Sequence, residues 1–286
     1  MVGRFTRLRR ALAAAAAGVL GVVAFAGDVG AQGKVDARYV VTLAGVPIGR
    51  GAWVIDINDD QYIAAANGKT TGLLSVFASG EGTSAARGYV SKGQLVPSTY
   101  VSSMTTDKKT EELHITLAGG NVKDYTVDPP TPPHPDRIPL TDAHRRGVSD
   151  PMSASLAHVA GTGDPVSPEA CNRTVAVFDG RLRYDLKLAY KRMDAVQAGK
   201  GYAGPAVVCA LYFTPIAGYI PGRAAIKYLI AQRDMEAWLV PVAGTRVMVP
   251  FRVVIPTPLG MGVLEANEFV TEPQPQRTSA SAAKIP

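Results

Sequence analysis

Short runs of alternating apolar and polar residues, separated by turn residues, follow one another along most of this chain. DARYVVTL (36–43), IGRGAWVIDI (48–57) and QYIAAANGKT (61–70) are the first three runs, and AGVP and NDD separate them. Alternation with a period of two is typical of strands that bury one face, and glycine, proline and acidic residues are typical of reversals. The pattern therefore predicts an opening β-meander.

The same pattern continues towards the end of the chain. Further strands are expected in the segments 82–90, 97–106, the two runs of 112–127 joined by Gly119-Gly120, 171–190, 235–242, 245–255 and 261–270. The segment 206–213, AVVCALYF, is apolar on both faces, which predicts a central strand covered on each side. About a dozen strands with few helices predict a mainly β fold with a single curved antiparallel sheet, because a strongly twisted sheet of this size rarely stays flat. We expect an open or half barrel.

Three segments have helical features. Apolar residues of GLLSVFAS (72–79) recur at spacings of three and four, and Asp150-Pro151 supplies a capping residue and a first-turn proline before MSASLAHVA. We expect these two short helices to cover the concave face of the sheet. Residues 222–233, GRAAIKYLIAQR, fit a helix and a strand almost equally, so both alternatives stay open.

The start of the chain has the three-part layout of a secretory signal peptide. Basic residues up to Arg10 precede an apolar run (11–25), and small residues allow cleavage after Ala26 or Ala31. An uncleaved membrane anchor is the alternative. Four of the positive charges behind the net charge of +6 lie in this segment, which argues against a nucleic-acid partner. We expect a periplasmic protein with a signal peptide (1–31), a single β domain (32–271) and a disordered tail (272–286), and no transmembrane span after processing.

Both cysteines lie in the segment 171–219. Export to an oxidising compartment predicts a disulfide between Cys171 and Cys209, with two buried free thiols as the alternative. Two outer strands of a three-stranded meander lie about 10 Å apart, which exceeds the span of a disulfide. Cys171 is therefore expected before the regular ladder, or else the two cysteine-bearing strands pair directly.

The clearest turn signal is Asp179-Gly180. A two-residue type I′ turn there pairs Phe178 with Arg181, Val177 with Leu182 and Val175 with Tyr184. The apolar residues of both strands then share one face. The charged residues Asp179, Arg181, Arg183 and Asp185 are interpreted as the solvated side of the hairpin and its turn.

The chain lacks a recognisable catalytic constellation. His134, Asp136, Asp142 and His144 have no tight metal-ligand spacing and lie near PPTPPHPDRIP (129–139), which we interpret as an extended surface linker. No G-x-S-x-G elbow, dinucleotide-binding motif or phosphate loop is present. We therefore expect a protein that is not an enzyme and uses neither cofactor nor metal, with an unrecognised hydrolase as a third alternative.

Three segments resemble a known family: VFDGRLRYDL, YAGPAVVCALYFTPIAGY and the opening YVVTLAGVPIGRGAW. Together they resemble a domain-of-unknown-function family of exported Gram-negative envelope proteins, over about Arg38 to Val270. The resemblance implies a periplasmic location and a curved sheet similar to that of the lipoprotein-carrier proteins of the lipoprotein localisation pathway. A disulfide-bearing β-spiral family of envelope-integrity proteins is also similar. The resemblance carries no catalytic residues.

Two functional hypotheses follow for the mature chain. The first is a binding or carrier protein for an apolar ligand, a lipid or acyl chain, with lipid or lipoprotein as the partner. The second is a structural protein that holds other envelope proteins together. If a ligand lies in the concave face, the aromatic residues expected to line it are Trp53, Phe77, Phe213 and Trp238.

Overall fold

A single large β-sheet organises the protein. The computed structural model describes residues 32–71 and 79–274, in which the sheet follows the order β7-β6-β5-β4-β3-β2-β1-β15-β14-β13-β12-β10-β9. Short strands β8 and β11 are added to it, and β11 pairs with β15 in parallel. The path ends at β7 and β9 and does not close. The prediction of an open, curved and mainly antiparallel sheet is confirmed.

The first half of the chain forms the meander that the alternation predicts. Each strand pairs with the next, in the order β1 (Gly33–Leu43), β2 (Val46–Ile57), β3 (Gln61–Thr70), β4 (Gly80–Ser91), β5 (Gln94–Thr106), β6 (Thr110–Ala118) and β7 (Asn121–Asp128). In β1 the residues Val35, Ala37 and Tyr39 are buried while their neighbours are exposed. This period of two assigns an inward and an outward face to every strand of the layer.

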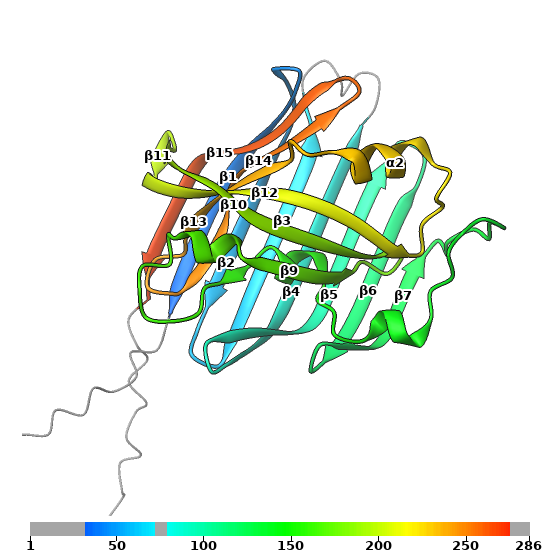
Figure 1. Ribbon diagram of the computed structural model, residues 1–286, viewed down its shortest axis with the longest axis horizontal. Helices are drawn as coiled ribbons and strands as arrows, with labels where there is room; N and C mark the ends of the chain where they lie inside the picture. The colour runs from blue at the N-terminus through cyan, green and yellow to red at the C-terminus, as the bar shows by residue number, and fades with distance from the viewer. Residues whose placement is uncertain (1–31, 72–78, 275–286) are drawn as a thin grey trace, which may run out of the picture.

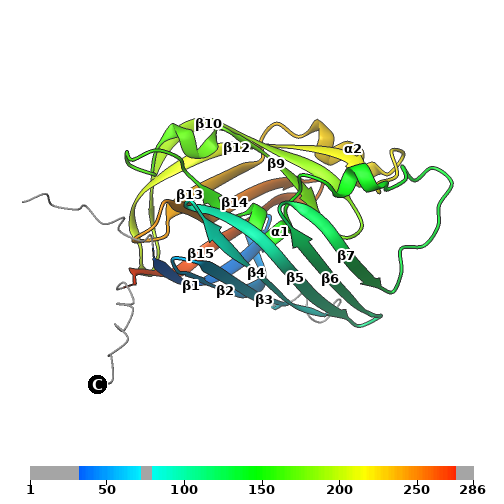
Figure 2. The same cartoon turned by 90° about the horizontal axis from the view of Figure 1, so that it is seen from below.

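The second half of the chain forms a layer that crosses the first. Figure 2 shows β9, β10 and β12 above the row β1–β7, and Figure 1 shows them running across it. The strands and bridges of this half are β8 (Ala157–His158), β9 (Arg173–Phe178), β10 (Arg183–Gln197), β11 (Lys200–Gly201), β12 (Ala203–Ala217), β13 (Glu236–Pro241), β14 (Val247–Thr257) and β15 (Gly260–Pro273). Because β15 pairs with both β1 and β14, it connects the layers.

Two α-helices accompany the sheet in the described residues. Helix α1 (Pro151–Ala154) packs against β4, β5 and β9, so it lies between the layers, and the Asp150 carboxylate caps it as predicted. The segment 222–233, for which a helix and a strand were both expected, contains helix α2 (Ala224–Ala231). Two short 3₁₀ turns are η2 (Asp142–Arg145) and η3 (Pro168–Cys171). The helix expected at 72–79 falls on residues outside the described part of the chain.

A hydrophobic core fills the space between the layers. Val35, Ile55 and Tyr62 contribute from the first layer and Phe178 and Phe251 from the second, and all are almost completely buried. The ring of Tyr125 meets that of Phe178 edge-on, with centroids 5.1 Å apart. The Tyr62 hydroxyl forms a hydrogen bond of 2.7 Å with the Ser153 hydroxyl of α1. The protein's own side chains therefore occupy the inward face of the sheet.

The disulfide between Cys171 and Cys209 is present, with the two Cα atoms 5.3 Å apart. Cys171 ends η3 and precedes the ladder of β9, which confirms the first of the two placements expected from the sequence. The bridge belongs to a second buried cluster, in which Ala157, Val159 and Ala170 pack on Leu239 and Met248. It thus fastens the segment before β9 to the centre of β12.

The hairpin after β9 corrects one prediction. Phe178 pairs with Arg183 and Val177 with Tyr184, so residues 179–182 form a four-residue loop where we expected a two-residue turn. The reason lies in the Asp179 carboxylate, which accepts hydrogen bonds from the backbone N–H groups of Arg181 (2.9 Å) and Leu182 (2.6 Å) and so stabilises a wider loop. A shift of two positions keeps the apolar residues on one face, as predicted.

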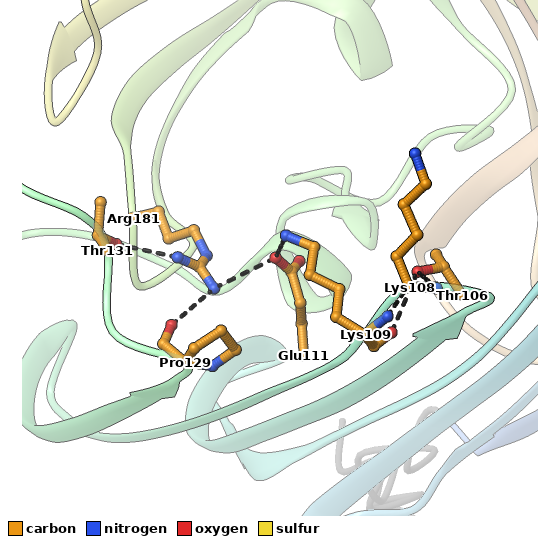
Figure 3. A network of polar contacts seen from close by, with 7 residues as sticks. All are labelled: Thr106, Lys108, Lys109, Glu111, Pro129, Thr131 and Arg181. Atoms are coloured by element: carbon orange, nitrogen blue, oxygen red, sulfur yellow. Dashed lines mark hydrogen bonds and ion pairs between the residues drawn. The ribbon is translucent and has the colours of Figure 1, made fainter.

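The charged residues of this hairpin are also less solvated than expected. Burial raises the pKa of the Asp179 carboxyl, and the Arg183 side chain is only 14% exposed. The Arg181 guanidinium donates hydrogen bonds to the Thr131 hydroxyl (3.0 Å) and the Pro129 carbonyl (3.2 Å). It also lies 3.6 Å from a carboxylate oxygen of Glu111 on β6 (Figure 3). Arg181 thereby ties the proline-rich segment and the hairpin to the first layer.

Candidate functional site

Two adjoining hollows lie along β2–β5, and we call them together the outer groove. The first has a volume of about 790 Å³ and extends to β1, and the second has a volume of about 640 Å³ and extends to β7. Asn67, Thr83 and Ser103 line both hollows, so they form one continuous surface. Ligand sites in proteins commonly have volumes of about 300–1,000 Å³.

The strand register explains why these residues meet on the outward face. Ala52 pairs with Asn67, Asn67 with Thr83, and Thr83 with Ser103, which sets one side chain from each of β2, β3, β4 and β5 in a row. Rows two residues away along the strands point to the same side. Inward residues such as Ile55 alternate with them and lie in the core. The outer groove therefore occupies the face opposite the core.

One end of the outer groove is cationic. Arg50 pairs with Lys69 across β2 and β3, and Lys69 pairs with Glu81 on β4. Arg38 lies beside them and forms an ion pair of 3.8 Å with Glu268. Within the described ranges, no carboxylate oxygen lies within 4.0 Å of the charged nitrogens of Arg50 or Lys69. These two side chains are exposed and can contact an anionic group.

The other end of the outer groove has an apolar row on β2–β5, bordered by Glu112 and His114 of β6 and Asp128 of β7. Val54, Ala65, Ala85 and Val101 follow one another across four neighbouring strands. Val54 and Val101 are exposed, although the alternation of each strand would allow polar residues there. This row lies four residues along the strands from the Arg50–Lys69 pair, or roughly 13 Å, and offers apolar contact surface there.

Glycines line the groove between its two ends. Gly51, Gly68 and Gly82 pair side by side on β2, β3 and β4 and contribute only backbone to the surface. A Cβ atom on Gly51 would lie 2.6 Å from the Asn67 carbonyl oxygen, so the strands can approach this closely only with glycine there.

A third hollow, of about 550 Å³, lies beside α1 and contains Ser153 and His158. They do not form a nucleophile–base pair: the Ser153 hydroxyl bonds to Tyr62, and His158 Nδ1 lies 3.1 Å from the Gln94 amide nitrogen. Burial, and then nearby arginines, lower the pKa of His158. Burial raises the pKa of Asp150, whose Oδ1 caps α1. In the part of the chain that the structure describes, this hollow shows the capping of a helix and no acyl-transfer geometry.

Three of the four aromatic residues suggested as ligand-lining, Trp53, Phe213 and Trp238, are not among the residues that line the outer groove. Trp53 faces the core between the layers, and the guanidinium carbons of Arg192 and Arg252 lie 5.2 Å and 5.0 Å from the ring centroid of Trp238. Phe213 stacks on Tyr184 with centroids 5.3 Å apart, and Phe77 lies outside the described residues. A ligand contact by any of them stays a prediction. The outer groove itself was not predicted, and its only sequence signal is valine on the face of β2 and β5 that otherwise carries polar residues.

Histidine, cysteine and carboxylate side chains do not gather in threes in any arrangement that could hold a metal ion, as far as residues 32–71 and 79–274 are concerned. No helix among these residues is both long and apolar enough to cross a membrane.

Comparisons with known proteins give a family and a distant structural neighbour. A crystal structure of a beta-barrel-like protein of domain of unknown function DUF1849 from Brucella abortus is similar, with a TM-score of 0.44 and 8% identity. The alignment covers 85% of this chain and 98% of that one. No curated protein matches the sequence. The model of the family described as "protein of unknown function (DUF3108)" matches residues 38–267, which is most of the sheet, and the chain therefore belongs to the DUF3108 family.

Proposed function

We propose that the protein is a non-enzymatic binding or carrier module for an amphiphile that has an anionic head group and an acyl chain. The observation that carries this proposal is the polarity of the outer groove. Arg50 and Lys69 stand at one end without a close carboxylate partner among the described residues, and the row from Val54 to Val101 forms the other end. A fatty acid or acyl lipid has the same two ends.

The open shape of the groove sets the expected strength of binding. If it shields half of the surface of a ten-carbon chain, burial contributes on the order of 4 kcal/mol, at about 0.8 kcal/mol for each fully buried methylene. Each exposed ion pair to the head group adds less than about 1 kcal/mol. Because immobilising the ligand costs free energy that this sum leaves out, the dissociation constant should be no tighter than about 0.1 mM. Such an affinity suits a carrier that releases its ligand readily.

The proposed place of action is the periplasm of a Gram-negative cell. The signal-peptide pattern of the first residues supports export, and the Cys171–Cys209 disulfide supports an oxidising compartment. The resemblance to exported envelope proteins supports the same location. Maintenance of the envelope, by moving or holding lipid, is the role that we propose for the module.

A fluorescent fatty acid tests the proposal directly. Dansyl-undecanoic acid is titrated with the full-length protein and then displaced with palmitate. Ala85→Arg places a charge in the centre of the apolar row and should lower the affinity at least tenfold, while Lys69→Glu should lower it several-fold at low salt. Lys200→Glu makes the same charge change on the exposed β11 and should have no effect. Circular dichroism confirms that each variant is folded.

Binding that is unchanged in both groove variants would show that the ligand lies elsewhere, and binding that is absent from the unaltered protein would refute the proposal. Photo-crosslinking in cells with a diazirine-bearing fatty acid provides a second measurement, because a complex this weak would not survive purification. The labelling should decrease in Ala85→Arg but not in Lys200→Glu.

A further inference from the structure

Large apolar side chains protrude from the tips of two hairpins. Leu259 is 76% exposed and Met261 46% in the β14–β15 hairpin, and Val46 is 52% exposed in the β1–β2 hairpin. Ile255 on β14 is 38% exposed. Isolated exposed apolar residues are common on protein surfaces, but a group at one extremity of a molecule indicates an interaction site.

The two tips form one surface because their backbones are joined. The N–H of Ala44 donates a hydrogen bond of 2.9 Å to the carbonyl of Met261, and Leu43 pairs with both Val46 and Gly262. A Cβ atom on Gly260 would lie 2.8 Å from the Cβ of Ala44, so the tips touch. Figure 1 shows both hairpins at the same end of the molecule. We call Val46, Ile255, Leu259 and Met261 the apolar tip.

Cationic side chains lie behind the apolar tip on the same edge of the sheet. Arg50 follows Val46 on β2 and pairs with Lys69, and the register continues this row through Glu81 to Thr105 near the β5–β6 turn. That turn carries Lys108 beside Asp107, and Lys109, whose ammonium forms an ion pair with Glu111 (Figure 3), so the cations considered for the bilayer are Arg50, Lys69 and Lys108. A small apolar tip with lysine and arginine behind it is complementary to an anionic lipid bilayer, whose surface attracts cations and whose interior accepts apolar side chains.

We propose that the apolar tip inserts into the surface of an anionic lipid bilayer and holds the protein there reversibly. The two hairpins project from the molecule. A projecting shape is better suited to insertion between lipid headgroups than to contact with the flat surface of another protein. In this orientation the Arg50–Lys69 end of the outer groove lies next to the membrane, where an anionic lipid head could enter it. Contact with the bilayer does not depend on the proposed ligand; only its use in loading the groove rests on the proposed function.

A tryptophan placed at the tip reports insertion at that position. Leu259→Trp is mixed with vesicles of phosphatidylethanolamine and phosphatidylglycerol, and its emission is taken as the difference from the unaltered chain, which contains Trp53 and Trp238. The added emission should shift to shorter wavelength, and lipids brominated on the acyl chain should quench it. The matched control is Ile63→Trp, at a residue that is 50% exposed near the opposite end of β3 and should show neither effect. Because the added emission comes from residue 259 alone, it does not report membrane contact made by the apolar residues 11–25.

Charge placed at the tip tests the energetic role of the same residues. Leu259→Asp with Met261→Asp should lower vesicle co-sedimentation at least tenfold, and vesicles of phosphatidylcholine alone should bind several-fold more weakly than anionic ones. An unshifted, unquenched Leu259→Trp signal, or shifts of equal size at residues 259 and 63, would overturn the proposal. Titration of the double variant with dansyl-undecanoic acid separates the two proposals. Intact ligand binding with vesicle contact lowered supports both, whereas undiminished vesicle contact together with an unquenched Leu259→Trp signal refutes only the apolar tip.

Discussion

Breaking the Cys171–Cys209 disulfide should destabilise the protein mainly through the unfolded state. The two residues are separated by 38 positions, and their Cα atoms lie 5.3 Å apart in the folded chain. In the chain-entropy account, closing a loop of this length removes about 4 kcal/mol of conformational freedom from the unfolded chain. Reduction should therefore lower the free energy of unfolding by about 4 kcal/mol, with no change in the fold.

Urea unfolding measures this loss. With a slope of about 3 kcal/mol per molar urea, the midpoint should fall by about 1.3 M in the reduced protein. The slope itself should rise, because an unfolded chain without the bridge is more expanded. Far-ultraviolet circular dichroism and tryptophan emission are followed together, so that coincident curves establish a single transition.

The reduced wild-type chain is the proper comparison, since it keeps both sulfur atoms in the buried cluster with Ala170 and Leu239. Cys171→Ala with Cys209→Ala should be less stable again, because it also removes buried volume. A reduced midpoint within about 0.4 M of the oxidised one, or roughly 1 kcal/mol, would refute the entropic reasoning. It would mean that the segment before β9 is held by packing alone.

Three further predictions concern single side chains. Burial raises the pKa of the Asp150 carboxyl, so between the ordinary carboxyl pKa and the raised one the folded state binds more protons than the unfolded state. Stability should therefore fall as pH rises through this range. Asp150→Asn should flatten the dependence of the melting temperature on pH in this range, and an unchanged slope would contradict the reasoning. Trp238→Phe loses the 2.9 Å hydrogen bond to Asp194 and weakens two cation–π contacts, and should cost about 1–2 kcal/mol in urea unfolding; a cost near zero would refute those contacts. Arg181→Met should cost about 1 kcal/mol in urea unfolding and speed amide hydrogen exchange at 129–139. Slow exchange there would show that the segment is held without the guanidinium.

The meander could be predicted from the sequence because each of its strands buries only one face. The third run was expected at 61–70 and forms β3 over the same residues, and the first two extend by a few residues at their starts. Alternation carries this information directly, since the inward residues must be apolar. The capping of α1 by Asp150 followed from a local rule, and the disulfide followed from a single pair of cysteines in a chain expected to be exported.

The hairpin loop and the site depend on interactions that alternation does not describe. The side chain of Asp179 satisfies two backbone donors and so changes the loop length, which a dipeptide rule for turns does not include. The groove residues come from strands far apart in sequence and look like a solvated face one strand at a time. Only the register places Val54, Ala65, Ala85 and Val101 in one row. Helix α1 and the second layer pack on the inward side, where a covering helix was expected from the sequence, and a ligand on that side stays a prediction.

The distribution of apolar residues over the two faces of the first layer argues for a partner on the outward face. The inward face is occupied by the core, so folding alone requires nothing apolar on the other side. Polar residues there would cost the fold nothing and would improve solubility, yet Val54, Ile63 and Val101 are exposed. Valine and isoleucine favour strands, but threonine does so as well and keeps a hydroxyl in water. The apolar row, with Arg50 and Lys69 at one end of it, therefore supports the proposed ligand contact in the outer groove.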